Sequence, residues 1–270
     1  MASNGLEDTI QIQAEAVRLV FEDRARGIER YYREFPVDEA AALSVQAVHS
    51  TDTPGSGAAA RPAASKDVGP SAALLNLQTT QRLAFLSAFD CSVIGNLFDA
   101  FDVDGDGVLS QAEGKKLLTQ WLKGAQLHLL SVLEKLVAGL VTCKIRMGLA
   151  MSRLLDTQAG EDDEDVEWVL EKTEMTCGIH LSPHDTNVDL KAQERGKTKA
   201  SLVIVNFGPR LEPLLNGLSV ETMYKSVLLP MHGSENGVEK SQFLESFVDY
   251  LEGYFGVHFI LRQLLARDAS

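Results

Sequence analysis

The fold of this chain is decided by the stretch 102-DVDGDGVLSQAE-113. Three aspartates, Asp102, Asp104 and Asp106, stand at alternate positions, Gly107 follows them, and Glu113 closes a segment of twelve residues. Every specified position matches the calcium-loop pattern D-x-[DN]-x-[DN]-G-x₅-E. The sequence therefore predicts a site for one calcium ion, and the rest of the chain is interpreted outward from this loop.

Calcium is a hard cation that takes about six to eight oxygen ligands, and the loop offers oxygens at regular intervals. Aspartates supply side-chain oxygens, the seventh residue a backbone carbonyl, the ninth a water-mediated contact, and the twelfth both oxygens of a long carboxylate. The predicted metal ligands are Asp102, Asp104, Asp106, Val108, Ser110 and Glu113. A bidentate twelfth residue favours Ca²⁺ over Mg²⁺, which requires a smaller octahedral shell.

Apolar residues recur at helical spacing on both sides of the loop, which predicts a helix–loop–helix unit. They are Ile94, Leu97, Phe98 and Phe101 before it, and Leu117, Leu118 and Trp121 after it. The alternative is a solvated acidic turn without an ion. Three carboxylates within five residues would repel one another in an empty loop, which makes that alternative costly.

A second, incomplete copy of the same pattern occurs near the C-terminus. Apolar residues at Tyr224, Val227, Leu228 and Met231 precede the segment 232-HGSENG-237. If one residue is deleted, Val238 matches Leu109 and Gln242 matches Glu113. Neutral groups stand where carboxylates belong, so we expect little or no calcium affinity here. An ordinary helix–turn–helix remains an alternative for this segment.

The chain resembles the EF-hand calcium-binding proteins over Ser92 to Leu122. Hands of that family usually work in pairs, joined by a short backbone ladder between the eighth residues of their loops. On this chain the resemblance implies that Leu109 pairs with Val238. Some 120 residues separate Glu113 from His232, where the family commonly has a short connector. Either an insertion lies between paired hands, or the loop finds another partner.

We predict a mainly α fold: an EF-hand helix–loop–helix pair within a helical core, with a small antiparallel β insertion. The predicted divisions are 1–48, an N-terminal helical arm; 49–71, a flexible linker; 72–160, a helical region with the calcium-binding hand; 161–209, the β-containing insertion; and 210–270, a C-terminal helical region with the degenerate hand.

Periodicity and breaker residues support these divisions. A helix is predicted from Leu6 to Phe35, ended by Pro36, and a second from Asp38 to Val48. A long helical pattern runs from Ser110 to about Leu155, with glycines that could divide it, and its apolar middle, Leu127 to Val141, should be central and buried. The expected strands are Thr176 to Leu181, Asn187 to Ala192 and Ser201 to Phe207.

Composition excludes several classes of protein. The 270 residues include 25 Lys and Arg against 38 Asp and Glu, a formal net charge of −13, which argues against nucleic-acid binding. The 3 scattered cysteines favour a reducing compartment over a disulfide framework. The longest apolar run, Leu127 to Met151, is interrupted by charges, and no signal pattern opens the chain. We expect a soluble, intracellular protein of the cytoplasm without a membrane span.

Other sites are weaker. The spacing of Cys177, His180 and His184, beside Asp185, could bind zinc, but no second cysteine pair is present and a neutral turn explains these residues equally well. A cysteine–histidine pair for catalysis has no supporting local motif, and no phosphate-binding or dinucleotide fingerprint occurs. We therefore expect no enzymatic activity, and an enzyme with a regulatory hand is the least favoured of three classes.

The favoured function is that of a calcium sensor, or a calcium-dependent regulatory partner. Calcium would relieve repulsion among the carboxylates and reorient the helix that starts near Ser110. A protein partner would bind through the N-terminal helix, which packs either within the chain or on that partner, or through an apolar groove. The alternative is a structural subunit of a larger assembly, in which calcium only rigidifies the fold.

Overall fold

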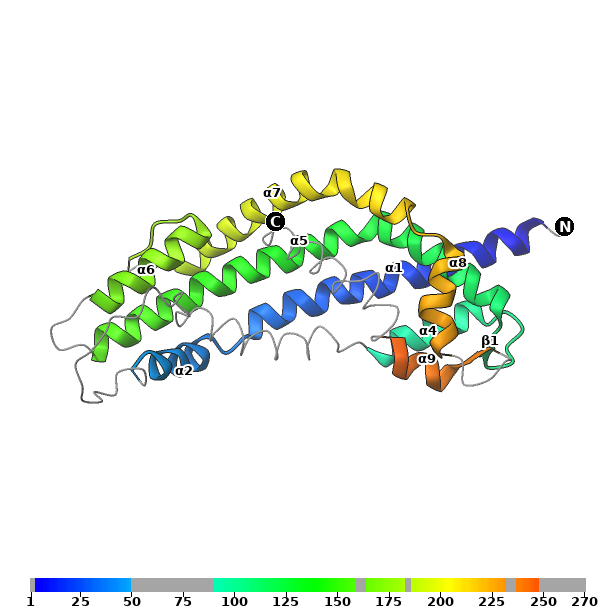
Figure 1. The fold of residues 1–270 in the computed structure, drawn as a ribbon, viewed down its shortest axis with the longest axis horizontal. Helices are drawn as coiled ribbons and strands as arrows, with labels where there is room; N and C mark the ends of the chain where they lie inside the picture. Colours follow the sequence, from blue (N-terminus) through cyan, green and yellow to red (C-terminus); the bar gives the residue numbers. More distant parts are fainter. Residues whose placement is uncertain (1–2, 50–89, 159–163, 183–185, 232–236, 248–270) are drawn as a thin grey trace, which may run out of the picture. The chain divides into compact units, whose positions relative to one another are not determined.

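The computed structural model describes residues 3–49, 90–158, 164–182, 186–231 and 237–247, and these are mostly helical (Figure 1). The elements in order are α1 (Ser3–Glu34), α2 (Val37–His49), α4 (Cys91–Phe101), β1 (Val108–Leu109), α5 (Gln111–Gln158), α6 (Glu164–Cys177), α7 (Val188–Asn216), α8 (Val220–Met223), the π-helix η1 (Tyr224–Leu228), the 3₁₀-helix η2 (Leu229–Met231), β2 (Val238–Glu239) and α9 (Lys240–Phe247).

The chain forms two compact units. The first unit contains residues 1–30, 86–137 and 200–270, and the second contains 31–85 and 138–199. Helices α1, α5 and α7 each contribute residues to both units. The predicted linker 49–71 lies outside the described residues, apart from His49 at the end of α2.

The N-terminal helices form where the sequence predicted them. Helix α1 ends at Glu34, two residues before Pro36, whose ring and missing N–H prevent the helix from continuing. Its apolar face is buried at Val17, Val20, Phe21 and Ile28, so the stripe packs within the chain. Helix α2 follows after a two-residue break, and its Ala41 and Val45 are buried in the second unit.

Helix α5 is one continuous element of 48 residues. Its glycines do not divide it. Gly124 and Gly139 instead accommodate side chains of α1, because a Cβ at either position would lie 2.3 Å from Val17 or Tyr32. The expectation that Leu127 to Val141 is buried throughout is wrong: Leu129, Val132, Leu133 and Leu136 are buried, but Leu127 is 75% exposed and Ser131 and Glu134 also face solvent. An apolar residue on the solvent side of a long helix is common and requires no partner.

The β-containing insertion predicted at 161–209 is wrong. The described residues of that segment form α6 and most of α7, and the three expected strands are helix or irregular chain there. The segment contains β-branched runs that resemble strands locally, but its buried small residues Ala192, Gly196 and Ala200 recur every four positions. That spacing forms one face of a helix.

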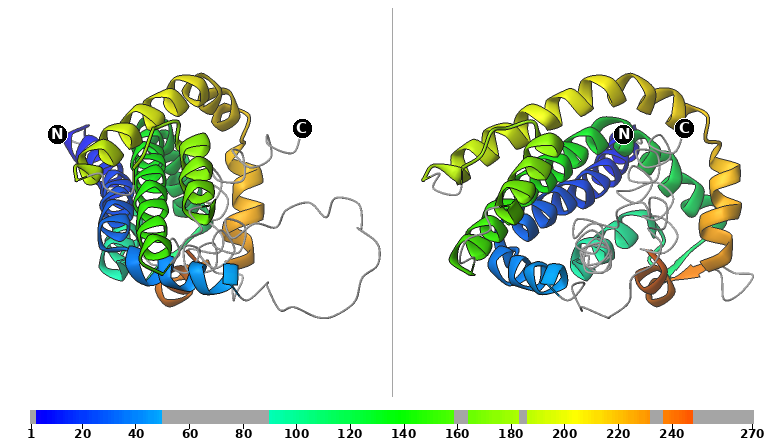
Figure 2. Two further views of the ribbon diagram at one scale, coloured as in Figure 1. Left: turned by 90° about the vertical axis from the view of Figure 1, so that its left-hand side faces the viewer. Right: turned by 60° about the vertical axis from the view of Figure 1, so that its left-hand side comes forward.

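A two-stranded antiparallel sheet does occur, in the first unit. It joins β1 to β2, with Val108 opposite Glu239 and Leu109 opposite Val238. Strand β2, drawn in orange, leads into α9 in the right-hand view of Figure 2. The pair Leu109–Val238 is the one that the resemblance to the EF-hand proteins implied. The sheet links a loop in the middle of the chain with a segment near its C-terminus. It joins two helical hairpins: the first consists of α4 and the start of α5, and the second of η1, η2 and α9.

Aromatic side chains fill the core of the first unit around this sheet. The Phe98 ring of α4 lies 5.6 Å from the Phe243 ring of α9. Trp121 of α5 contacts Phe247 of α9 at 5.6 Å and Phe21 of α1 at 4.8 Å between ring centroids. Both hairpins and α1 therefore share one core, and movement of any of them changes the surroundings of Trp121.

The second unit has a smaller aliphatic core. Ala41, Val45, Met151, Leu155, Val166 and Val169 form one buried cluster of α2, α5 and α6. Ile145, Leu149, Cys177, Leu181 and Ala192 form another, where α5 meets the end of α6 and the start of α7. No described helix is both long enough and apolar enough to cross a bilayer.

Candidate metal centre

The predicted calcium loop connects two helices of the first unit, as its flanking periodicity required. Helix α4 begins after Asp90, whose carboxylate accepts the Ser92 N–H at 2.9 Å, and ends at Phe101. Asp102 follows as the C-cap, with its N–H donated to the Phe98 carbonyl at 3.0 Å. Strand β1 then leads directly into α5. The loop is therefore held between a capped helix and a hydrogen-bonded strand.

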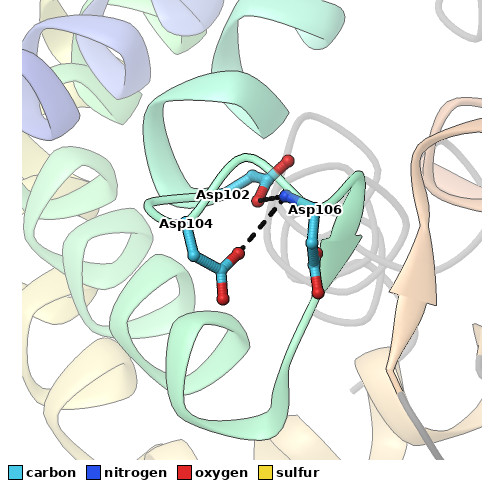
Figure 3. Close-up of side chains that lie close together, drawn as sticks. All are labelled: Asp102, Asp104 and Asp106. Carbon is cyan, nitrogen blue, oxygen red and sulfur yellow. Dashed lines mark hydrogen bonds between the residues drawn. The ribbon is translucent and has the colours of Figure 1, made fainter.

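The three aspartates meet on one side of the loop (Figure 3). One carboxylate oxygen from each of Asp102, Asp104 and Asp106 lies within 4.8 Å of the others. Two oxygens on opposite sides of a calcium ion are separated by roughly 5 Å, twice the usual Ca–O distance. The spacing therefore matches a shared ion, although exposed acidic groups also gather without one.

Backbone N–H groups hold the aspartates in this arrangement. The Asp102 carboxylate accepts from Gly105 at 3.0 Å, from Asp106 at 3.2 Å and from Gly107 at 3.0 Å. Asp104 also accepts from the Asp106 N–H at 3.3 Å (Figure 3). Gly107 has φ +80°, a conformation that glycine adopts without steric cost. The chain thus turns at the glycine that the pattern specifies.

Glu113 lies outside the group of three and closes the loop differently. Its side chain is buried and accepts from the Val103 N–H at 2.9 Å, the Ser110 N–H at 3.0 Å and the Ser110 hydroxyl at 2.7 Å. Ser110 and Glu113 form a capping box at the start of α5. The Ser110 hydroxyl therefore donates a hydrogen bond to Glu113. To contact calcium through a water molecule, as predicted, Ser110 would have to share that hydroxyl between Glu113 and the water.

The pKa values of Glu113 and Asp104 are shifted in opposite directions. Burial would raise the pKa of Glu113, but the Ser110 hydroxyl and the N–H groups of Val103 and Ser110 outweigh it, so the pKa is lowered. For Asp104 the Asp106 N–H would lower the pKa, but some desolvation and the negative charges of Asp106 and Glu113 together raise it. Repulsion within the cluster is thus present in the ion-free loop.

The residues of the cluster can hold a hard divalent cation, a class that includes calcium. All side-chain donors of the cluster are carboxylate oxygens, which suit a hard divalent cation such as Ca²⁺, Mg²⁺ or Mn²⁺. Val108 donates its N–H to Asp106 at 2.8 Å and pairs with Glu239 in the sheet, which fixes the backbone at the seventh position. The negative charges of Asp106 and Glu113 near Asp104 are ones that a bound cation would offset.

The C-terminal segment repeats part of this geometry. The Gln242 side chain accepts from the Glu239 N–H at 3.3 Å, as Glu113 does from Ser110. Gly237 has φ +129° and is buried beside β1. Residues 232–236 lie outside the described part of the chain. Gln242 therefore caps α9 without supplying the charge that a metal would need.

The discounted zinc site has no support among the described residues, where only the three aspartates meet as a group of metal-ligating side chains. Cys177 is buried, and burial raises the pKa of its thiol, which makes it a weak ligand and nucleophile. The exposed His180 ring lies 3.0 Å from Glu174. His184 and Asp185 lie outside the described residues.

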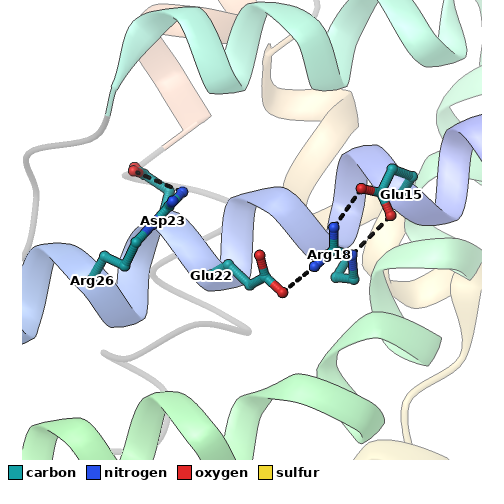
Figure 4. A network of polar contacts seen from close by, with 5 residues as sticks. All are labelled: Glu15, Arg18, Glu22, Asp23 and Arg26. Carbon is teal, nitrogen blue, oxygen red and sulfur yellow. Dashed lines mark hydrogen bonds and ion pairs between the residues drawn. The ribbon is translucent and has the colours of Figure 1, made fainter.

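Helix α1 carries a second charged cluster, on its exposed side (Figure 4). Arg18 bonds Glu15 at 2.5 and 2.8 Å and also pairs with Glu22, while Asp23 lies 3.9 Å from Arg26. The hydrogen bond with Arg18 lowers the pKa of Glu15. These pairs are three or four residues apart, as solvated helix-stabilising pairs are. These pairs are consistent with stabilisation of α1 itself.

A comparison of the chain with protein-family models, with curated proteins and with solved structures finds no match. The case for the metal centre therefore rests on its residues and their geometry.

Sequence reasoning found the aspartates but missed two features around them. The Ser110–Glu113 capping box was available from its S-x-x-E spacing. The ion pair of Lys240 with Asp99, at 2.6 and 2.7 Å, had no such signal, because its members are 141 positions apart.

Proposed function

We propose that the loop Asp102–Glu113 binds one calcium ion and that this chain is a calcium-responsive protein of the EF-hand type. The observation that carries the proposal is the convergence of three aspartate oxygens within 4.8 Å on a loop that turns at Gly107. Expected affinity lies in the sensor range, with a dissociation constant on the order of 10⁻⁷–10⁻⁵ M.

The neighbouring segment supports the interpretation of a pair of hands. Contacts between the two hairpins cross over: α4 of the first packs on α9 of the second through Phe98 and Phe243. The start of α5 packs on η1, where a Cβ at Gly114 would lie 2.8 Å from Leu228. Together with the Leu109–Val238 pairing, this is the reciprocal arrangement expected of two hands.

Calcium would act on the loop through the side chains that now repel each other. A bound ion neutralises the charge of Asp102, Asp104 and Asp106, while Glu113, at the start of α5, connects the loop to that helix. A shift of Glu113 toward the cluster would move the first turn of α5 and with it Trp121. This route is the basis for a sensor function.

The alternative function is a structural subunit in which calcium only rigidifies the fold. One observation favours it: much of the apolar face of α1, including Val17, Phe21 and Ile28, is already buried within the chain, although Ile10 and Ile12 remain exposed. The two functions share the metal site and differ in what calcium moves.

The test is calcium titration of the full chain by calorimetry, with Asp102→Asn as the test variant. We expect one site for the wild-type chain and a loss of affinity of at least tenfold for the variant. Asp156→Asn, an exposed carboxylate on α5 of the second unit, is the matched control and should bind normally. Absence of binding at millimolar calcium, or equal binding by all three proteins, would contradict the proposal.

A further inference from the structure

Lys240 contacts both ends of the aspartate segment while belonging to the other hairpin. Its ammonium bonds the two carboxylate oxygens of Asp99 at 2.6 and 2.7 Å. Its backbone N–H donates to the Gly107 carbonyl at 3.3 Å. Asp99 precedes the first predicted ligand, Asp102, by three positions, and Gly107 immediately follows Asp106. One residue thus spans the segment that carries all three aspartates.

The side chain of Lys240 is guided to Asp99 by the surface it crosses. Its ammonium lies 5.9 Å from the centre of the Phe98 ring. Gly95 is buried beneath it, and a Cβ there would lie 3.7 Å from Lys240 Cε. The aliphatic stem therefore lies along α4 while the charged end reaches the carboxylate, as lysine side chains do on apolar surfaces.

The loop of the second hairpin contains two carboxylates, Glu235 and Glu239, and neither stands where the first loop has an aspartate. His232, Ser234 and Asn236 stand at the positions where the first loop has aspartates. The second loop therefore lacks the ligand pattern of the first, and Lys240 connects this hairpin to the first loop through Asp99 and Gly107. A salt bridge this exposed contributes little to global stability, but it can fix the register of two elements.

We propose that Lys240 is a positioning residue for the calcium site: through Asp99 and Gly107 it holds β2 and α9 against α4 and the loop, and so raises the calcium affinity without being a ligand. The inference rests on the proposed calcium binding. Its physical basis is preorganisation, because a loop already held in its binding conformation loses less freedom when the ion arrives.

Positioning and simple electrostatics predict opposite results for Lys240. If only charge mattered, Lys240→Met would make the surroundings more negative and raise calcium affinity, whereas Asp99→Asn would lower it. If the contact between Lys240 and Asp99 positions the loop, both variants lower the calcium affinity. We expect a loss of roughly fivefold for each, the lower end of coupling between neighbouring sites. The exchanged pair, Asp99→Lys with Lys240→Asp, keeps the net charge and should recover most of the loss.

The experiment is calorimetric calcium titration of the full chain at constant ionic strength, with melting temperatures measured in calcium and in chelator. Lys135→Met is the matched control, because Lys135 forms a comparably exposed pair with Glu29 at 3.3 Å in the same unit, far along α5 from the loop. It should leave calcium affinity unchanged. If Lys240 only stabilised the fold, Lys240→Met would lower the melting temperature equally in calcium and in chelator. If Lys240 positions the calcium site, the variant also reduces the rise in melting temperature that calcium causes.

The outcomes separate the two proposals. A wild-type chain that binds no calcium overturns both. Normal binding by the wild type together with unchanged or increased affinity in Lys240→Met overturns the positioning role alone. Reduced affinity in both single variants, with recovery in the exchanged pair, supports it.

Discussion

Gly107 shows what a single residue contributes to the loop. Its φ of +80° is one that other residues rarely adopt, and no atom lies within 4 Å of a Cβ placed there. Gly107→Ala should therefore introduce backbone strain without a clash. We expect it to lower the free energy of unfolding in chelator by about 1 kcal/mol, as measured by urea denaturation.

The control for this prediction is Gly27→Ala, in the interior of α1. A Cβ at Gly27 also meets nothing within 4 Å, but the backbone there is helical. This substitution should raise the free energy of unfolding by about 0.5–1 kcal/mol. Destabilisation by both variants to the same extent would show that Gly107 is not under special constraint.

The opposite pKa shifts of Asp104 and Glu113 predict opposite dependences of stability on pH. The raised pKa of Asp104 means that its ionisation disfavours the folded chain, so its unfavourable contribution develops as the pH rises through its titration range. The lowered pKa of Glu113 means that its ionised form favours folding, and that contribution is lost as the pH falls below roughly 4.5.

Two variants measure these contributions in chelator. Asp104→Asn should be more stable than the wild type at neutral pH, and its advantage should shrink as the solution is acidified. Glu113→Gln should be less stable at neutral pH by about 1 kcal/mol, the usual cost of a lost cap, and its deficit should shrink below roughly pH 4.5. Curves that run parallel to the wild type from pH 7 to about pH 3, a range that includes the ordinary pKa values of both carboxyl groups, would refute the assignment.

For single residues, the sequence predicted the features whose members lie close together along the chain. The aspartates, the turn glycine and Glu113 stand within one loop whose spacing encodes the chemistry. The bonds that Glu113 makes to Val103 and Ser110 were not predicted, although the spacing of Ser110 and Glu113 contained the signal. The contact of Lys240 with Asp99 could not be predicted, because pairing of distant charged residues depends on the tertiary fold.

Among the elements, β1 and β2 meet where a substitution can separate them. Gly237 has φ +129°, and a Cβ there would lie 2.5 Å from the Leu109 carbonyl oxygen. Gly237→Ala should therefore disrupt the sheet and lower the free energy of unfolding by about 2 kcal/mol or more. We also expect weaker calcium binding, measured by calorimetry, because the seventh and eighth loop residues lie in β1.

The matched control for the sheet is Gly208→Ala in α7. A Cβ there would lie 3.6 Å from Leu130, an ordinary contact distance. That variant should keep the stability and the calcium affinity of the wild type or slightly increase the stability. Unchanged calcium affinity in Gly237→Ala would show that the sheet does not support the loop.

Helix α7 shows why element type was harder to predict than the site. Its segment Ser201–Val205 is rich in β-branched residues, whose local preference favours a strand. In the structure the buried residues Phe207, Leu211 and Leu215 recur every four positions, and helical packing overrides that preference. The four-residue period of the buried positions indicates a helix here, whereas the β-branched composition alone indicates a strand.

Across the whole first unit, Trp121 is placed to report a calcium response. The chain has 2 tryptophans, so Trp168→Phe leaves Trp121 as the single emitter. Its ring contacts Phe21 of α1 and Phe247 of α9. A sensor should change the emission wavelength of this variant when calcium replaces chelator, because α5 moves against those rings.

A structural subunit gives a different result in the same experiment. Calcium would raise the melting temperature of the Trp168→Phe variant and leave the Trp121 emission unchanged. The variant with Trp121→Phe in place of Trp168→Phe is the control, since Trp168 belongs to the second unit and should not respond in either case. An emission change confined to Trp168 would contradict both functions as proposed.

The strand pairing has a consequence for how this protein assembles. Leu109 and Val238 are 129 positions apart in the sequence, yet they lie opposite each other. Contacts this distant form slowly, because a long intervening chain must first be closed. During synthesis the aspartates emerge well before the strand that completes their loop. A ribosome-bound chain ending before Val238 should therefore capture calcium poorly, and acquisition of the ion becomes a late event in the maturation of this molecule.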